Sequence, residues 1–185
     1  MTKPFNLVDR LQVRAAMFAI GRSTLRSQGA PGMVAQARKF LRKVDLRRFS
    51  VATLDQFMDV LEEHTGLLAD EFPGKGRGNW GAARKSLNIF LRDVLYSRYL
   101  CEYYKLAVLE PWLEVPLDSN VHKGLLSDVD NPKTMVPWPG VKALTAEVSS
   151  ELQSVALSVA KSLDVARVHL DVRYWRRDAV DELAG

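Results

Sequence analysis

The feature that most constrains the fold is a glycine-rich turn followed by a long stretch of apolar residues at helical spacing. The turn, FPGKGRGN at 72–79, contains too much glycine to continue a helix. From about Ala82 to Tyr104, apolar residues recur every three or four positions and cover more than one side of the predicted helix. We therefore predict a central helix that is buried on several sides, with its tyrosines in the core.

The same periodicity predicts further helices at 7–27, 33–44, 54–65, 120–126, 141–163 and 165–178. Gly66 is expected to break the third of these helices or to start a short second piece through Glu71, and β-branched alternation is confined to 113–115. The chain is thus predicted to be all-α, a single compact domain over 1–185. Its predicted regions are the N-terminal helices at 1–71, the turn, central helix and following segment at 72–126, and a closing loop and helices at 127–185.

Charge is segregated along the chain, whose net charge is +4. Residues 10–48 contain ten basic residues and one acidic residue, whereas residues 49–73 contain six acidic residues and no lysine or arginine. Such a basic face is typical of a protein that binds a polyanion, and a solvated surface is the alternative interpretation.

Several classes of protein are disfavoured by composition. No apolar run approaches the roughly 20 residues that a bilayer requires, so we expect no membrane association and a cytoplasmic location. The single cysteine, Cys101, excludes an internal disulfide, and the three histidines lack partners at metal-ligand spacing. No dinucleotide or phosphate-loop fingerprint occurs in its required context, so neither a metal nor a cofactor is expected.

Two residues near predicted helix starts could share a cleft. Lys85 follows the glycine turn, and Asp118 ends an extended segment, LEVPLDS at 113–119. Positive neighbours such as Arg77 and Arg84 would favour the uncharged, nucleophilic form of the Lys85 amine. Two simpler interpretations stay open: Asp118 caps a helix, and Lys85 is a surface lysine that contacts solvent or phosphate.

The residues around this pair resemble those of helix-hairpin-helix DNA glycosylases. GAARKSLN at 81–88 looks like the family's G-R-K-T-A-N run, VPLDSNV at 115–121 like its V-P-V-D-T-H-V segment, and VHLDVRYW at 168–175 like its D-L-x-L-W pattern. The resemblance covers 72–126 well, the last helix loosely and the first seventy residues by no motif. Lys85 and Asp118 are 33 residues apart, a longer separation than in the commonest members and similar to the archaeal 8-oxoguanine branch. The turn is also longer than the family's compact L-P-G-V-G-R-K.

The resemblance implies a monomeric enzyme that excises a damaged or modified base from duplex DNA, in repair or in defence against modified foreign DNA. Asp118 would be the catalytic carboxylate, and Lys85 a nucleophile whose attack on the sugar adds Schiff-base lyase activity. Phosphate contacts are expected from basic side chains and from free N–H groups of the turn glycines: Lys39, Lys43, Lys75, Gly76, Arg77, Gly78 and Arg84. The flipped base would stack on aromatic residues of a pocket, for which Trp80, Trp112 and Trp138 are the candidates.

Two other classes of function are compatible with the sequence. A helical module without catalytic activity could bind nucleic acid through the same basic face. A protein–protein adaptor could instead present that face to an acidic partner.

Overall fold

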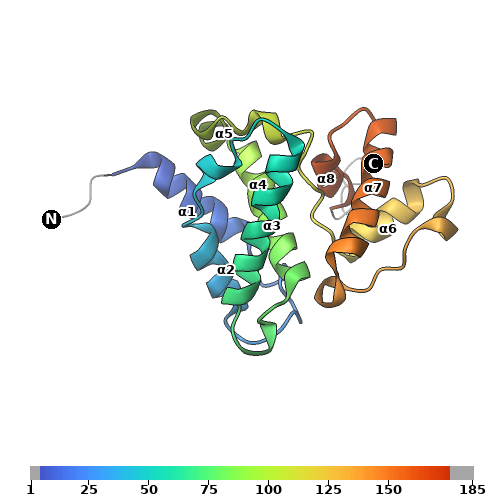
Figure 1. Ribbon diagram of the computed structural model, residues 1–185, viewed down its shortest axis with the longest axis horizontal. Helices are drawn as coiled ribbons and strands as arrows, with labels where there is room; N and C mark the ends of the chain where they lie inside the picture. The colour runs from blue at the N-terminus through green and yellow to red at the C-terminus, as the bar shows by residue number, and fades with distance from the viewer. Residues whose placement is uncertain (1–4, 176–185) are drawn as a thin grey trace, which may run out of the picture.

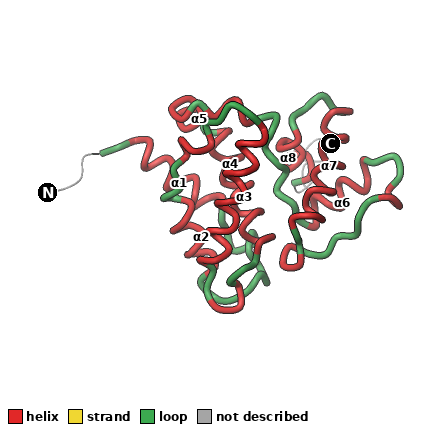
Figure 2. The backbone as a smooth tube through the Cα atoms, in the orientation of Figure 1, coloured by secondary structure: helices red, strands yellow, loops and turns green. Residues whose placement is uncertain are grey.

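Helices form all of the regular secondary structure in the computed structural model, which describes residues 5–175 (Figure 2). The prediction of an all-α fold is therefore confirmed for this part of the chain. None of the helices described there is long and apolar enough to cross a membrane. The α-helices are α1 (Leu7–Ala19), α2 (Met33–Leu41), α3 (Leu54–Glu71), α4 (Trp80–Tyr96), α5 (Arg98–Tyr104), α6 (Ser119–Asp128), α7 (Ala146–Ser162) and α8 (Leu170–Tyr174). Short 3₁₀ turns connect them: η1 (Leu46–Phe49), η2 (Gly74–Gly76), η3 (Leu106–Leu109), η4 (Pro132–Thr134), η5 (Val141–Ala143) and η6 (Arg167–His169).

The helices gather into two groups, which we call the N-terminal lobe (α1–α5) and the C-terminal lobe (α6–α8) (Figure 1). The N-terminal lobe has a core that includes the fully buried rings of Phe49, Phe57 and Phe90. A second apolar cluster, which includes Leu152 and Tyr174, fills the C-terminal lobe. The connecting segment 110–118, a turn at 110–112 followed by extended residues, carries the chain from one lobe to the other.

Helix α4 is the centre of the structure, as predicted. Every residue from Gly81 to Asn88 is buried, and α4 packs against α1, α3 and η5. The helix nevertheless ends at Tyr96, because Ser97 adopts an extended conformation before α5 begins. The prediction of one helix as far as Tyr104 is therefore wrong. Tyr104 is buried, whereas the other tyrosines of this stretch project from the surface: Tyr96, Tyr99 and Tyr103.

Other helix boundaries differ from the predicted ones where side-chain hydrogen bonds or distant packing outweigh the local sequence pattern. Helix α1 ends at Ala19 rather than at residue 27, since the Thr24 hydroxyl accepts from the Gly21 N–H and donates to the Ala19 carbonyl. Helix α3 continues through Gly66 as far as Glu71, so the predicted break is wrong.

The helices near the C-terminus also have bounds that differ from the predicted ones. Thr145 caps α7, so the predicted helix from residue 141 is divided into η5 and α7. The predicted last helix is shorter than expected and comprises η6 and α8, and Val172 and Trp175 are exposed rather than in the core. Residues 176–178 of that prediction lie outside the described part of the chain.

The lobes are in close contact at Gly81, near the start of α4. A Cβ atom at this position would lie 2.1 Å from the Val141 carbonyl oxygen and 2.9 Å from the Leu144 Cβ. Glycine is therefore required here because a backbone carbonyl of the C-terminal lobe rests on the helix.

Two glycine substitutions test this contact. Gly81→Ala is expected to lower the free energy of unfolding by about 1–3 kcal/mol or more, because the added methyl group forces the lobes apart. Gly66→Ala is the matched control, since nothing lies within 4 Å of its Cβ position. That variant should gain about 0.5–1 kcal/mol from improved helix propensity. Urea denaturation of both proteins measures the difference, and a Gly81→Ala protein as stable as the parent would contradict the contact.

Candidate active site at the lobe junction

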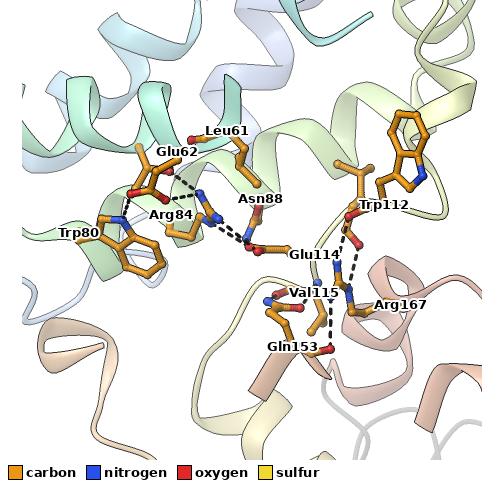
Figure 3. Close-up of polar contacts among 12 residues, drawn as sticks. Leu61, Glu62, Trp80, Arg84, Asn88, Trp112, Glu114, Val115, Gln153 and Arg167 are labelled. Atoms are coloured by element: carbon orange, nitrogen blue, oxygen red, sulfur yellow. Dashed lines mark hydrogen bonds and ion pairs between the residues drawn. The ribbon is translucent and has the colours of Figure 1, made fainter. Parts of the chain in front are cut away.

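The segment that joins the lobes is fixed on one side by a buried ion pair (Figure 3). Glu114, on this segment, is 4% exposed, and Arg84 on α4 is 5% exposed. The Arg84 guanidinium donates to both Glu114 oxygens, with Nε–Oε2 at 2.9 Å and Nη2–Oε1 at 3.2 Å, and Asn88 Nδ2 donates to Oε2 at 2.8 Å. Arg84 Nη1 also donates to Glu62 and to the Thr65 hydroxyl. These contacts hold the segment against α4.

Two residues of the C-terminal lobe hold the other side of the same segment. Arg167 donates to the carbonyl oxygens of Trp112, at 2.9 Å, and Leu113, at 3.3 Å. Burial lowers the pKa of Arg167 from its ordinary value, and the charge of Glu114 opposes that shift. The Gln153 side chain accepts from the Val115 N–H and donates to the Val115 carbonyl, as a neighbouring strand would. At Trp112, Leu113 and Val115 the backbone of the segment is therefore hydrogen-bonded by side chains, and the described residues include no strand that could do so.

Within this frame Lys85 meets Asp118. Lys85 Nζ donates to Asp118 Oδ2 at 3.1 Å, across 33 residues of sequence. Asp118 Oδ1 accepts from the N–H groups of Asn120 and Val121, so the same carboxylate is also the N-cap of α6. The Lys85 side chain is 9% exposed and the Asp118 side chain 28%, so the pair reaches solvent mainly at Asp118. The expected meeting of the two residues is thus observed.

The expected positive surroundings of Lys85 are not observed. Arg84 is neutralised by Glu114 and Glu62. In the described part of the chain, the ion-pair partner of Lys85 is Asp118, whose carboxylate attracts an ammonium group. The structure thus places the Asp118 carboxylate, and not an unpaired cation, in contact with the Lys85 ammonium group.

A narrow space, which we call the polar slot, lies beside Lys85 between the lobes. It measures about 160 Å³ in total and has no room for a water molecule. Two of its polar atoms, Asn88 Oδ1 and Ser149 Oγ, are buried and make no hydrogen bond. Ser149 lies on α7 and had no signal in the sequence, because nothing local distinguishes it from the other serines of that helix. The slot is lined by Arg84, Lys85, Asn88, Leu117, Leu144, Ser149 and Gln153.

Several predicted phosphate contacts are contradicted by the structure. Arg84 is buried in its ion pair and cannot reach DNA. The glycine turn has no free N–H groups at the expected positions, because Gly76 donates to Pro73, Arg77 to Gly74 and Gly78 to Ala69. Gly76 is itself buried.

The remaining basic side chains are available to a ligand. Lys75 and Arg77 are exposed on the glycine turn. Lys39 and Lys43 are also exposed, at the end of α2 and in the turn after it. These side chains therefore form two separate pairs on the N-terminal lobe.

The three predicted base-stacking tryptophans do not form one pocket. The Trp80 indole N–H donates to Glu62, and the Arg84 guanidinium lies 5.1 Å from the centre of the Trp80 ring. Trp112 packs on Phe57 in the core of the N-terminal lobe. Figure 3 shows these two rings on opposite sides of Glu114. Trp138 packs beside His122, one helical turn after Asp118. Trp80 and Trp138 both pack against the apolar cluster of the C-terminal lobe, and Trp138 makes a ring contact with the helix that Asp118 caps.

Comparisons with known proteins assign no family to the chain. No family model matches it, and no significant match was found among curated proteins or solved structures. Within residues 5–175, no three histidine, cysteine or acidic side chains are grouped so that they could hold a metal ion. The proposals below therefore depend on the geometry of the residues and on the resemblance of the motifs.

The buried ion pair can be tested by removing one partner. Glu114→Ala is expected to cost about 3–5 kcal/mol of unfolding free energy, because it leaves the Arg84 charge buried with too few partners. Glu63→Ala is the control: it breaks the bidentate pair with Arg48 at the surface, where solvent screens the charges, and should change stability little. Urea denaturation of the two variants gives the comparison, and equal losses would contradict the importance assigned to Glu114.

Proposed function

We propose that this protein is a DNA N-glycosylase that removes a damaged or modified base from duplex DNA. The contact between Lys85 and Asp118 carries the proposal. These are the two residues that the glycosylase resemblance singles out, and they lie 3.1 Å apart although 33 residues separate them. Their place at the junction of two lobes is suited to a base that enters between the lobes.

The carboxylate has the chemistry that cleavage of an N-glycosidic bond needs. As the bond breaks, the departing base takes the bonding electron pair and positive charge builds on the sugar around C1′. The Asp118 carboxylate would stabilise that charge or activate an attacking water molecule. Asp118 is the more exposed member of the pair, so the sugar would approach from its side.

Lys85 can act in either of two ways. If its ammonium group loses a proton, the amine can attack C1′ as the base departs, and opening of the sugar ring then gives a Schiff base from which the DNA strand is cleaved. If Lys85 stays protonated, it holds the Asp118 carboxylate in place and water completes the hydrolysis. A covalent adduct that borohydride can trap distinguishes the two.

The polar slot is the proposed site for the base. Buried polar atoms without partners each cost about 1–3 kcal/mol, so Asn88 Oδ1 and Ser149 Oγ favour a ligand that supplies the missing hydrogen bonds. Leu117 and Leu144 give the slot apolar walls. Because the slot is closed, a flipped base can enter only if α4 and α7 move apart. The phosphates nearby would contact the exposed side chains of Lys75 and Arg77. We expect a monomer that acts on cytoplasmic DNA.

Base release is the direct test. The protein is incubated with duplexes that carry oxidised, deaminated, alkylated or hypermodified bases, in the presence and absence of borohydride. Asp118→Asn should abolish base release while it preserves the fold, because asparagine also caps helices well. Lys85→Gln should abolish any covalent adduct. Asp55→Asn and Lys161→Gln are matched controls on exposed positions of α3 and α7 and should behave like the parent.

The other outcomes select the alternative functions. Base release that survives Asp118→Asn would contradict the assigned role of Asp118. Salt-dependent DNA binding without release from any duplex would indicate a nucleic-acid-binding module. If the protein binds no DNA, the result would indicate the third function, a protein–protein adaptor.

Ser149→Ala tests the polar slot separately. Removal of a buried hydroxyl without partners should leave the unfolding free energy unchanged or raise it slightly. Loss of a hydrogen bond to the base should at the same time lower kcat/KM for the preferred duplex by about tenfold or more. Urea denaturation and single-turnover base release measure the two quantities. A stable variant with full activity would exclude Ser149 from base recognition.

A further inference from the structure

A second, larger pocket lies on the opposite side of α3 from the Lys85–Asp118 pair. We call it the α2–α3 pocket; its volume is about 400 Å³. Glu62, which contacts Arg84, and His64, which lines this pocket, are two residues apart on α3, so they point about 200° apart around the helix. Helix α3 therefore separates the two sites. The pocket is lined by Lys39, Phe40, Lys43, Val44, Asp45, Arg48, His64, Leu67 and Glu71.

His64 is a buried polar group that faces this pocket with one nitrogen free. The residue is 5% exposed, and its Nδ1 donates to the Val60 carbonyl at 2.8 Å, since a carbonyl can only accept. Its Nε2 makes no hydrogen bond to any residue in the described part of the chain. The Phe49 ring, 5.0 Å away between centroids, and the Phe40 ring pack against the imidazole and fix its orientation. The pocket thus contains a positioned hydrogen-bonding atom that the fold does not use.

The charges around the pocket leave two cations without partners. Arg48 forms a bidentate pair with Glu63, a contact that raises the pKa of Arg48 and lowers that of Glu63. At the rim, Asp45 pairs with Arg47, whereas Glu71 accepts a hydrogen bond from the neutral Gln36 amide and keeps its charge. Lys39 and Lys43 make no ion pair within residues 5–175 and are exposed. Because both side chains line the pocket, their ammonium groups can act on one anion bound there.

The walls of the pocket suit a flat, partly apolar ligand. Phe40 and Val44 contribute apolar surface, and the Leu67 side chain is 48% exposed although it lies on α3. Nucleobases stack readily on aromatic rings, and a cavity of about 300–1,000 Å³ is usual for small ligands.

We propose that the α2–α3 pocket binds a nucleoside 5′-phosphate. The phosphate lies between Lys39 and Lys43, the base packs on Phe40 and Leu67, and the polar edge of the base meets His64 Nε2. The same chemistry is offered by a free nucleotide and by one nucleotide of a DNA strand. This inference is independent of the glycosylase proposal, because it requires neither Lys85 nor Asp118.

Isothermal titration calorimetry at low salt tests the pocket with the whole 185-residue chain. The probes are the four deoxynucleoside 5′-monophosphates, the matching nucleosides, inorganic phosphate and a single-stranded pentanucleotide. At least one mononucleotide should bind at least tenfold more tightly than its nucleoside and than inorganic phosphate. Combined Lys39→Gln and Lys43→Gln substitution should weaken that binding at least tenfold. Lys161→Gln, which removes one exposed lysine from α7, should leave it unchanged.

A blocking variant and the choice of probe complete the test. Leu67→Trp, which fills the pocket from an exposed position, should abolish binding without unfolding the protein. A pentanucleotide that binds more than tenfold more tightly than the mononucleotide assigns the pocket to a DNA strand, and equal affinities assign it to free nucleotide. The proposal is overturned if no mononucleotide binds saturably, if inorganic phosphate binds equally well, or if the double lysine substitution has no effect.

Discussion

The buried pair of Arg84 and Glu114 is the interaction on which the arrangement of the two lobes depends. It brings an extended segment, which has no strand beside it, against the most buried helix of the protein (Figure 3). Removing two charges from water is costly, and that cost is offset here because Asn88, Thr65 and Glu62 complete the hydrogen bonding of the pair. Asp118 follows Glu114 by four residues on the same segment. Fixing Glu114 on α4 therefore also fixes the distance between Asp118 and Lys85, which lies next to Arg84 in sequence.

The two lobes make unequal contacts along their junction, and the inequality suggests how a base could be admitted. At Glu114 the contacts are ion pairs and hydrogen bonds with good geometry. At the polar slot, α4 and α7 each contribute one polar atom without a partner, and Leu117 on the connecting segment and Leu144 before α7 complete the walls. Separating these surfaces leaves the Arg84–Glu114 pair intact and exposes polar atoms that water can satisfy. Opening at the slot is therefore less costly than opening at Glu114, and the connecting segment can serve as the fixed side of the movement.

Local sequence rules were sufficient for features that depend on neighbouring residues. The caps at Thr53, Asn79 and Asp118 were all predictable, because a short polar side chain before an apolar-periodic stretch satisfies free N–H groups. The approach of Lys85 to Asp118 was predictable through motif resemblance. The role of Arg84 was not, because adjacent basic residues look alike until a partner 30 positions away is known. The continuity of α3 through Gly66 was also not predictable, because burial of both flanking turns outweighs the low helix propensity of one glycine.

Counting charges along the sequence overstates the extent of the basic surface and assigns it to the wrong part of the protein. In the N-terminal region, Arg38 donates to the Ile20 carbonyl, Arg48 pairs with Glu63, and Arg47 lies near Asp45 and over the Tyr104 ring. The cations left without acidic partners include Lys39 and Lys43, at one end of α2. The other end of α2 touches the glycine turn, where the Met33 side chain packs on Gly76. Lys39 lies six residues beyond Met33, about 9 Å along the helix axis, which is about three nucleotides of a DNA strand at roughly 3.4 Å each. A strand held by Lys75 and Arg77 could therefore extend to the α2–α3 pocket without leaving the N-terminal lobe.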